Sequence, residues 1–266
     1  MRGKIFISLA FTLTVVAACA HAHVASAKAR NRSPLSSSRQ LILVTTPGWG
    51  SVRGTLRRFE RKRARAKWTQ VGEAFEIVVG RSGLGWGDEV VGSKGAASKQ
   101  EEDEGPSKRE GDGRAPAGVF PLTRAFGFAD ARGASWLRMP YTPLTPGVEC
   151  VDDTASSQYN RIVDRRAVET VDWNSSERMR EVGGYAWGVV VAHNARAVPG
   201  RGSCIFLHVW AGPEKGTAGC TAMERTNLEA LLHWLDTKKS PLLVQLPRTE
   251  YARLRPLWNL PSVSAR

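Results

Sequence analysis

Short apolar runs separated by turn residues dominate the pattern along this chain. Runs of strand length occupy residues 41–44, 75–79, 188–193, 203–208 and 241–246, and Gly and Pro punctuate the segments between them. Apolar runs of four to eight residues bounded by such turns are typical of buried strands. The pattern therefore predicts a mainly β fold, a sandwich or barrel with a few short helices.

One segment near the C-terminus has helical periodicity instead. Between residues 226 and 237, leucines recur at positions 228, 231, 232 and 235. Thr226 and Glu229 have the spacing of a capping box, in which each side chain bonds a backbone N–H of the first turn. We expect one helix here, with a final strand after it.

Changes in composition suggest the domain boundaries. Residues 28–40 are rich in Arg, Ser and Pro and are interpreted as a linker, and the domain is expected to span residues 41–250. Residues 93–114 carry many charges and almost no apolar side chain beyond Ala, which predicts a disordered insertion. Residues 251–266 are interpreted as a C-terminal tail.

The first 27 residues have the pattern of a signal peptide. A positive start at residues 1–4 precedes an apolar run at residues 5–18 and an Ala-Ser-Ala sequence at residues 25–27. The run is too short for a permanent membrane span, so no integral membrane domain is expected. Cys19 also fits a lipoprotein-processing site, which leaves a lipid anchor open. Either form of processing predicts export to the periplasm or cell envelope.

The charge of the chain narrows the class of partner. Lys and Arg number 38 against 25 Asp and Glu, a formal charge of +13, which becomes +11 if Arg2 and Lys4 leave with the signal. This balance favours an anionic partner such as nucleic acid, lipid or a wall polymer, and export argues against nucleic acid. Residues 53–67 carry eight Arg or Lys. They form either an exposed charged hairpin or a patch for an anionic polymer.

Cysteine arithmetic leaves one thiol of interest. After removal of residues 1–27, Cys150, Cys204 and Cys220 remain, an odd number in an oxidising compartment. A disulfide between Cys150 and Cys204 would leave Cys220 free, although the sequence alone does not show that they lie close enough.

Candidate chemistry gathers around Cys220. Gly219 and other small residues flank it, so a substrate carbonyl could approach the thiol and the backbone N–H groups of Gly219 and Cys220 could face an oxyanion. His208, twelve residues upstream at the end of an apolar run, could accept the thiol proton. A small buried cysteine and a structural histidine are the alternative interpretation.

Three segments resemble the L,D-transpeptidase catalytic (YkuD) domain. Residues 206–208 and 217–220 resemble its catalytic His and its Ser/Thr-His-Gly-Cys motif, and residues 115–122 resemble its Thr-Pro-x-Gly-x-Phe segment. The resemblance implies a β-sandwich of mixed sheets. It also implies an exported cysteine acyltransferase, without cofactor, that acts on peptidoglycan stem peptides and forms cross-links or trims D-Ala.

The same resemblance implies roles for individual residues. Cys220 would be the nucleophile, His208 the base and Gly219 part of the oxyanion hole, while Thr217 stands where the family has Ser or Thr. Because a nucleophile and its base must meet, we expect the imidazole within about 4 Å of the sulfur, in one cleft.

Three departures from the family pattern weaken the substrate assignment. Ala218 replaces a His, Ala222 stands where an Arg commonly follows the Cys, and the interval from His to Cys is shorter than usual. Arg201, Arg225 and the basic residues 53–67 are then the candidates for binding a substrate carboxylate.

Two further questions are the role of His193 and whether the site could bind a metal. His193 ends the apolar run 188–193 and is expected to contact substrate or to be structural, with a catalytic role less favoured. Zinc could in principle bind His193, His208 and Cys220, but their spacing matches no metal motif, so no metal is predicted. A non-catalytic wall-binding protein with a basic surface remains the alternative, although such a protein needs neither Cys220 nor His208.

Overall fold

The computed structural model describes residues 33–87 and 105–263. Its helices are α1 (Arg225–Trp234) and α2 (Arg248–Trp258). Its strands are β1 (Gln40–Thr46), β2 (Arg53–Glu60), β3 (Thr69–Val78), β4 (Leu84–Trp86), β5 (Ala115–Gly127), β6 (Tyr141–Pro143), β7 (Val148–Val151), β8 (Ile162–Asp164), β9 (Ser176–Arg178), β10 (Trp187–Val191), β11 (Phe206–Val209), β12 (Thr221–Met223) and β13 (Leu242–Pro247).

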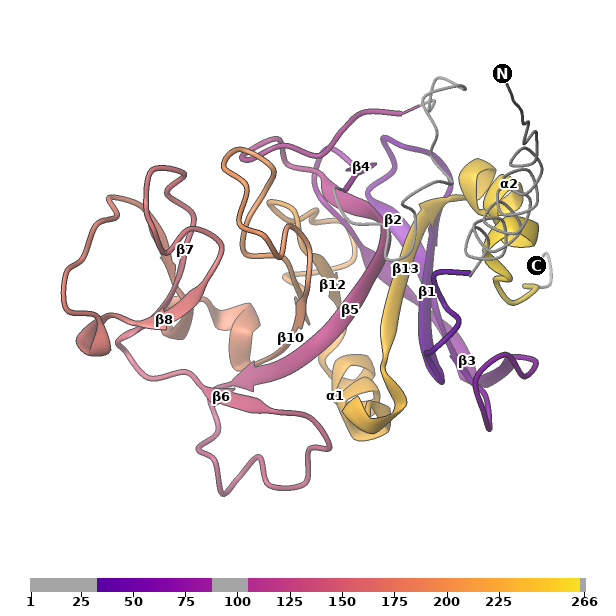
Figure 1. Cartoon of the computed structure of the whole chain (residues 1–266), viewed down its shortest axis with the longest axis horizontal. Helices are drawn as coiled ribbons and strands as arrows, with labels where there is room; N and C mark the ends of the chain where they lie inside the picture. The colour runs from indigo at the N-terminus through magenta and orange to yellow at the C-terminus, as the bar shows by residue number, and fades with distance from the viewer. Residues whose placement is uncertain (1–32, 88–104, 264–266) are drawn as a thin grey trace, which may run out of the picture. The chain divides into compact units, whose positions relative to one another are not determined.

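Most strands belong to one mixed sheet that curls back on itself (Figure 1). Its order is β10-β11-β12-β3-β2-β1-β13-β5-β4, and β10 pairs with β5 as well as with β11. The pairs β1–β13 and β11–β12 are parallel, whereas β1–β2, β2–β3 and β13–β5 are antiparallel. The predicted mainly β fold with mixed sheets is confirmed.

Helix α1 covers the core that the curled sheet encloses. Its buried residues Leu228, Leu231 and Leu232 belong to the same apolar cluster as Leu207 of β11. The predicted helix is therefore confirmed.

The capping box predicted for this helix is wrong. The helix begins at Arg225, so Thr226 is already its second residue, and no side chain caps its start. Glu229 instead accepts a hydrogen bond from Arg225 at 2.8 Å.

Helix α2 packs against the opposite face of β1 and β13 (Figure 1). Its residues Tyr251, Leu254 and Trp258 are buried in a second apolar cluster, together with Leu35, which is 1% exposed. The interpretation of residues 251–266 as a tail is therefore wrong for the helical part. The linker interpretation of residues 28–40 is likewise wrong from residue 33 on, because this segment packs into the domain.

A small three-stranded sheet, β8-β7-β9, lies beside the large one (Figure 1). A third apolar cluster joins the two sheets and includes Met179, Tyr185, Phe206 and Cys220. The possible disulfide is confirmed, since Cys150 of β7 is bonded to Cys204, just before β11, with a Cα–Cα distance of 6.0 Å.

Several expectations fall wholly or partly outside the described residues. The signal peptide, the possible anchor at Cys19 and residues 93–104 of the expected insertion lie outside them. Residues 105–114 are described, and the expectation of disorder is wrong for this part, because Asp112 pairs with Lys108 within it. Within the described residues, no helix is long and apolar enough to cross a membrane.

Candidate active site

Cys220 is the free cysteine of the described chain and lies directly before β12. It is 6% exposed. Its sulfur accepts a hydrogen bond from the backbone N–H of Phe206 at 3.3 Å, and its thiol donates to the carbonyl oxygen of Cys204 at 3.4 Å. Both partners belong to the segment that enters β11, the parallel neighbour of β12. The disulfide at Cys204 thus anchors the segment that holds the thiol.

Burial raises the pKa of the Cys220 thiol well above its ordinary value, and the nearby Glu177 carboxylate raises it further. Three groups act in the opposite direction and favour the thiolate: the Phe206 N–H, the Tyr185 hydroxyl and the charge of Lys108. The resting sulfur is therefore a thiol, and its reactivity depends on those three groups.

His208 lies on the same face of the sheet as Cys220. Within β11 it follows Phe206 by two residues, so both side chains point to the side of the third apolar cluster. The His208 Nδ1 atom is 2.8 Å from the carbonyl oxygen of Val209, which makes Nδ1 the protonated nitrogen and leaves Nε2 as the acceptor. Burial lowers the pKa of His208, so the ring is neutral near pH 7 and able to accept a proton.

Within the part of the chain that the structure describes, the sulfur and the imidazole have other hydrogen-bond partners than each other. The parallel register places His208 opposite Ala222, two residues beyond Cys220. Tyr185 lies near both: its ring meets the His208 ring edge-on at 5.2 Å, and it belongs to the same apolar cluster as Cys220, whose thiolate its hydroxyl favours. Among the described residues, no hydrogen bond joins the imidazole directly to the sulfur.

Thr217 fixes the turn that presents Cys220. Its hydroxyl donates to the carbonyl oxygen of Cys220 at 2.6 Å and accepts from the Gly219 N–H at 3.1 Å. The Gly219 N–H expected in the oxyanion hole is therefore occupied in this state. Gly219 has a second constraint, because a Cβ there would lie 3.1 Å from the carbonyl oxygen of Arg114. Glycine allows the loop of residues 105–114 to approach the turn.

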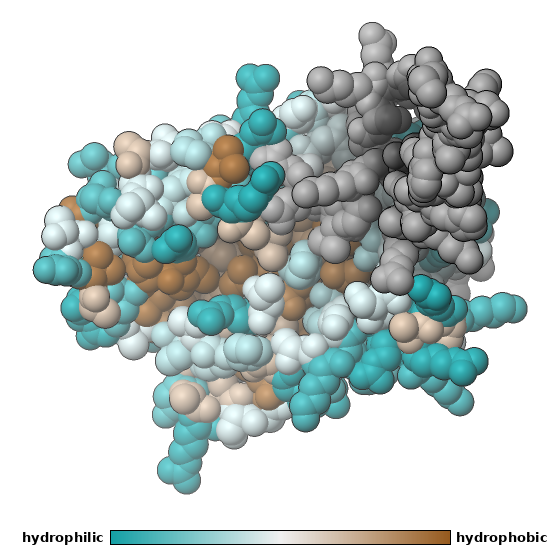
Figure 2. Space-filling view, in the orientation of Figure 1, coloured by the Kyte–Doolittle hydropathy of each residue, from teal (hydrophilic) through white to brown (hydrophobic). Residues whose placement is uncertain are grey.

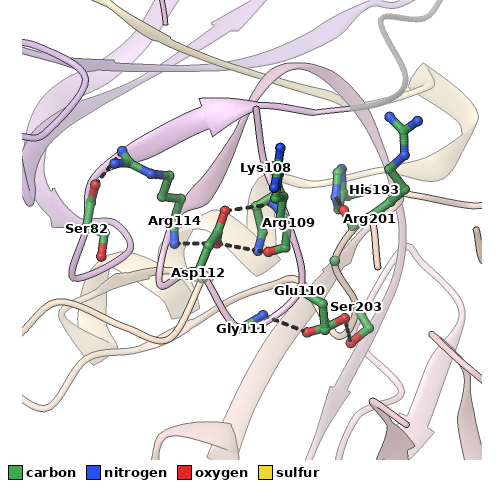
Figure 3. Close-up of polar contacts among 12 residues, drawn as sticks. Ser82, Lys108, Arg109, Glu110, Gly111, Asp112, Arg114, His193, Arg201 and Ser203 are labelled. Carbon is green, nitrogen blue, oxygen red and sulfur yellow. Dashed lines mark hydrogen bonds and ion pairs between the residues drawn. The ribbon is translucent and has the colours of Figure 1, made fainter. Parts of the chain in front are cut away.

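The loop of residues 105–114 is ordered because its charges are paired within it (Figure 3). The Lys108 side chain is 3% exposed and its Nζ lies 2.7 Å from Asp112. Asp112 also accepts from the backbone N–H groups of Arg109 and Arg114 at 2.7 and 2.9 Å. Glu110 accepts from Ser203 at 2.7 Å, which ties the loop to the segment before β11. The charge-rich composition was a misleading signal of disorder, since local pairing permits burial.

His193 and Arg201 belong to a neighbouring loop. His193 is 2% exposed, and its Nε2 lies 2.8 Å from the carbonyl oxygen of Arg201 (Figure 3). Its ring packs edge-on against Phe120, with the ring centroids 5.6 Å apart. These contacts favour the structural interpretation of His193. The Arg201 side chain is exposed and extends away from this cluster in Figure 3.

A cavity of about 310 Å³ lies between the small sheet and the curled sheet. The cavity reaches the disulfide at Cys150 and also Phe206, whose N–H donates to Cys220. Arg124 and Arg161 border the cavity. Apolar residues are visible in this region in Figure 2. Its lining residues are Thr123, Arg124, Cys150, Asn160, Arg161, Ile162, Val190, Val191, Ile205 and Phe206.

Fold and site together define a mainly β domain whose candidate chemistry centres on one free cysteine. The family model for the L,D-transpeptidase catalytic domain, YkuD, matches residues 60–244, and the chain belongs to this family. The family consists of cysteine-based L,D-transpeptidases, so membership supports a peptidoglycan-related transferase function in general terms. No curated protein and no solved structure matches the chain.

Sequence reasoning missed three groups that surround Cys220, namely Lys108, Glu177 and Tyr185. Lys108 was hidden in the segment expected to be disordered. Tyr185 follows Gly184, where a Cβ would lie 2.6 Å from the carbonyl oxygen of Val209. The Gly-Gly-Tyr sequence at residues 183–185 was thus a signal of close packing, but not of what it packs against.

Proposed function

We propose that this protein is an exported cysteine acyltransferase of the L,D-transpeptidase type, acting on peptidoglycan stem peptides through a thioester at Cys220. The observation that carries the proposal is the position of the free thiol and its hydrogen bonds. Cys220 ends a turn fixed by Thr217 and accepts the Phe206 N–H, with His208 on the same sheet face. Family membership supplies the reaction class.

In the proposed reaction, the Cys220 thiolate attacks the carbonyl between the L-centre of a dibasic residue and the terminal D-Ala. The proton of the thiol passes to Nε2 of His208, which returns it to the D-Ala amine as that group leaves. The amine of a neighbouring stem then attacks the thioester and restores the thiol, forming a cross-link. Water in place of that amine gives trimming of D-Ala. Catalytic hydrogen bonds are commonly long in empty sites and tighten on substrate binding.

The oxyanion of the tetrahedral intermediate needs a hydrogen-bond donor close to Cys220. The Gly219 N–H fills this role once it exchanges the Thr217 hydroxyl for the oxyanion. Arg124 and Arg161 border the adjacent cavity and are suited to bind substrate carboxylates. They replace Arg201 as the preferred candidates, since the cavity that they border reaches the strand in contact with Cys220.

Two features support export. The first 27 residues have the pattern of a signal peptide, and the Cys150–Cys204 disulfide suits an oxidising compartment. We place the protein in the periplasm or cell envelope, with a lipid anchor at Cys19 as the alternative to a soluble form. The formal charge, +13 for the full sequence and +11 without Arg2 and Lys4, favours contact with an anionic wall.

Purified protein incubated with tetrapeptide muropeptides tests the function. We expect cross-linked dimers or tripeptides in the mass spectrum, and none with Cys220→Ala. Absence of both products from the wild type, with the variant indistinguishable from it, would exclude the proposed reaction.

A non-catalytic wall-binding protein is the second candidate, favoured by the burial of the thiol and by the absence of a direct bond from His208 among the described residues. Treatment with a carbapenem separates the two. Stoichiometric acylation confined to Cys220 supports the enzyme, whereas an unmodified protein that still sediments with peptidoglycan supports the binder.

A further inference from the structure

Tyr185 occupies a central place among the groups around Cys220. It belongs to a single turn of 3-10 helix, Gly183–Ala186, that packs on β11. Its ring meets the rings of Phe126 and Phe206 edge-on at 5.5 Å each, and that of His208 at 5.2 Å. Aromatic contacts on three sides fix the ring, so the position of the hydroxyl oxygen is fixed as well.

The Tyr185 hydroxyl has one proton and two acceptors within reach. It donates to Oε2 of Glu177 at 2.6 Å. Tyr185 also shares an apolar cluster with Cys220, where its hydroxyl favours the thiolate form of that residue. A hydroxyl can donate to only one acceptor at a time. Glu177 and a Cys220 thiolate therefore compete for the same proton.

The charges around Tyr185 determine which acceptor the hydroxyl proton favours. Glu177, from β9, faces Tyr185, Asp152 and Glu110, and burial raises the pKa of its carboxyl. The side chains that act on Cys220, besides the backbone N–H of Phe206, are those of Glu177, Tyr185 and Lys108. An ionised Glu177 both repels a neighbouring thiolate and draws the Tyr185 proton away from it. A neutral Glu177 no longer repels the thiolate and is a weaker acceptor for the Tyr185 proton.

We propose that Tyr185 is a catalytic residue of this site, donating its hydroxyl proton to the Cys220 thiolate, and that Glu177 is the positioning residue that controls where this proton points. The inference rests on the proposed function for the role of Cys220 as nucleophile. No proton is lost from Tyr185 in this step, because the thiol proton goes to His208 during turnover, or to solvent in a titration. The hydroxyl only exchanges one acceptor for the other.

The two residues predict shifts of opposite sign in the apparent pKa of Cys220. Tyr185→Phe keeps the ring and removes the donor, and should raise the pKa by about one to two units, which means roughly 10- to 100-fold less thiolate at neutral pH. Glu177→Gln removes the repelling charge and should lower the pKa by about one unit.

The measurement is the pH dependence of Cys220 alkylation by iodoacetamide, followed by mass spectrometry on the full chain. Tyr251→Phe is the matched control, because this hydroxyl bonds the carbonyl oxygen of Pro261 in the α2 region at 2.7 Å. It should leave the pKa of Cys220 unchanged. Circular dichroism and thermal melting report whether each variant is folded.

An unchanged alkylation profile in folded Tyr185→Phe would overturn the proposal, as would a shift of the same sign in Glu177→Gln. If Tyr185→Phe does not fold, Glu177→Gln decides alone: a lowered pKa supports the proposal and an unchanged or raised one refutes it. The titration needs no muropeptide. A failed cross-linking assay together with opposite pKa shifts would reject the proposed function but keep Tyr185 as a hydrogen-bond donor to Cys220.

Discussion

Removing the disulfide between Cys150 and Cys204 should lower the free energy of unfolding by about 4 kcal/mol. The bridge joins residues separated by 54 positions. Closing a loop of this length removes about 14 cal/mol/K of conformational entropy from the unfolded chain, which is about 4 kcal/mol at 25 °C. The appropriate variant is Cys150→Ala with Cys204→Ala, because both sites are buried and alanine adds no polar group to them.

Urea unfolding at 25 °C, followed by tryptophan fluorescence, measures this loss. Wild-type protein unfolded in dithiothreitol is the chemical control and should give the same midpoint as the double variant. A loss below about 1 kcal/mol, with the slope of the transition unchanged, would refute the calculation, since the unfolded chain would then gain little freedom from reduction.

The local consequence of the same change concerns Cys220. The carbonyl oxygen of Cys204 accepts from the Cys220 thiol, and the Phe206 N–H donates to the Cys220 sulfur. Loosening this segment should expose the thiol, so Cys220 in the double variant should be alkylated faster than in the wild type at equal pH. Equal rates would show that the segment keeps its position without the bridge.

Three further changes test the site and the fold. His208→Ala should lower muropeptide turnover at least about 100-fold. It should also abolish the acid limb of the wild-type rate, which falls as pH drops through a His208 pKa below the ordinary 6.5; a retained limb would assign it to another group. Lys108→Met leaves Asp112 without its buried partner and should lower the free energy of unfolding in urea by about 3 kcal/mol. Adding Asp112→Asn should restore part of this loss. Leu254→Ala should cost about 2–4 kcal/mol, whereas Leu257→Ala on the same helix, 63% exposed, should cost almost nothing. Equal losses would contradict the docking of α2.

The central strands were predictable because both of their faces are buried. In β1, Ile42 and Val44 face the enclosed core, whereas Leu41 and Leu43 face the cluster that contains α2. A strand covered on both sides needs an unbroken apolar run, and this signal is local in the sequence. The partners of each strand are not local, so the sequence did not predict that β10 closes the sheet against β5.

Helix α2 was missed although its signal is present. Tyr251, Leu254 and Trp258 recur at intervals of three and four residues, as expected for one helical face. Arg253 and Arg255 between them, and Pro256 within the helix, obscured this periodicity. Polar composition was misleading for residues 105–114 as well. There Lys108 and Asp112, four positions apart, neutralise each other.

The candidate site was predictable as far as the candidate nucleophile, and the limit has a physical reason. The small residues around Cys220 and the odd number of cysteines after residue 27 are properties of the sequence, so Cys220 could be singled out. The pairing of the other two cysteines, which leaves Cys220 free, is seen in the structure. Its environment depends on strand register and on remote segments. Register places His208 opposite Ala222. A hydroxyl that favours the thiolate comes from Tyr185, which no spacing rule connects to Cys220. Since burial disfavours the thiolate, the groups that could restore its reactivity are those that only the folded structure brings to it.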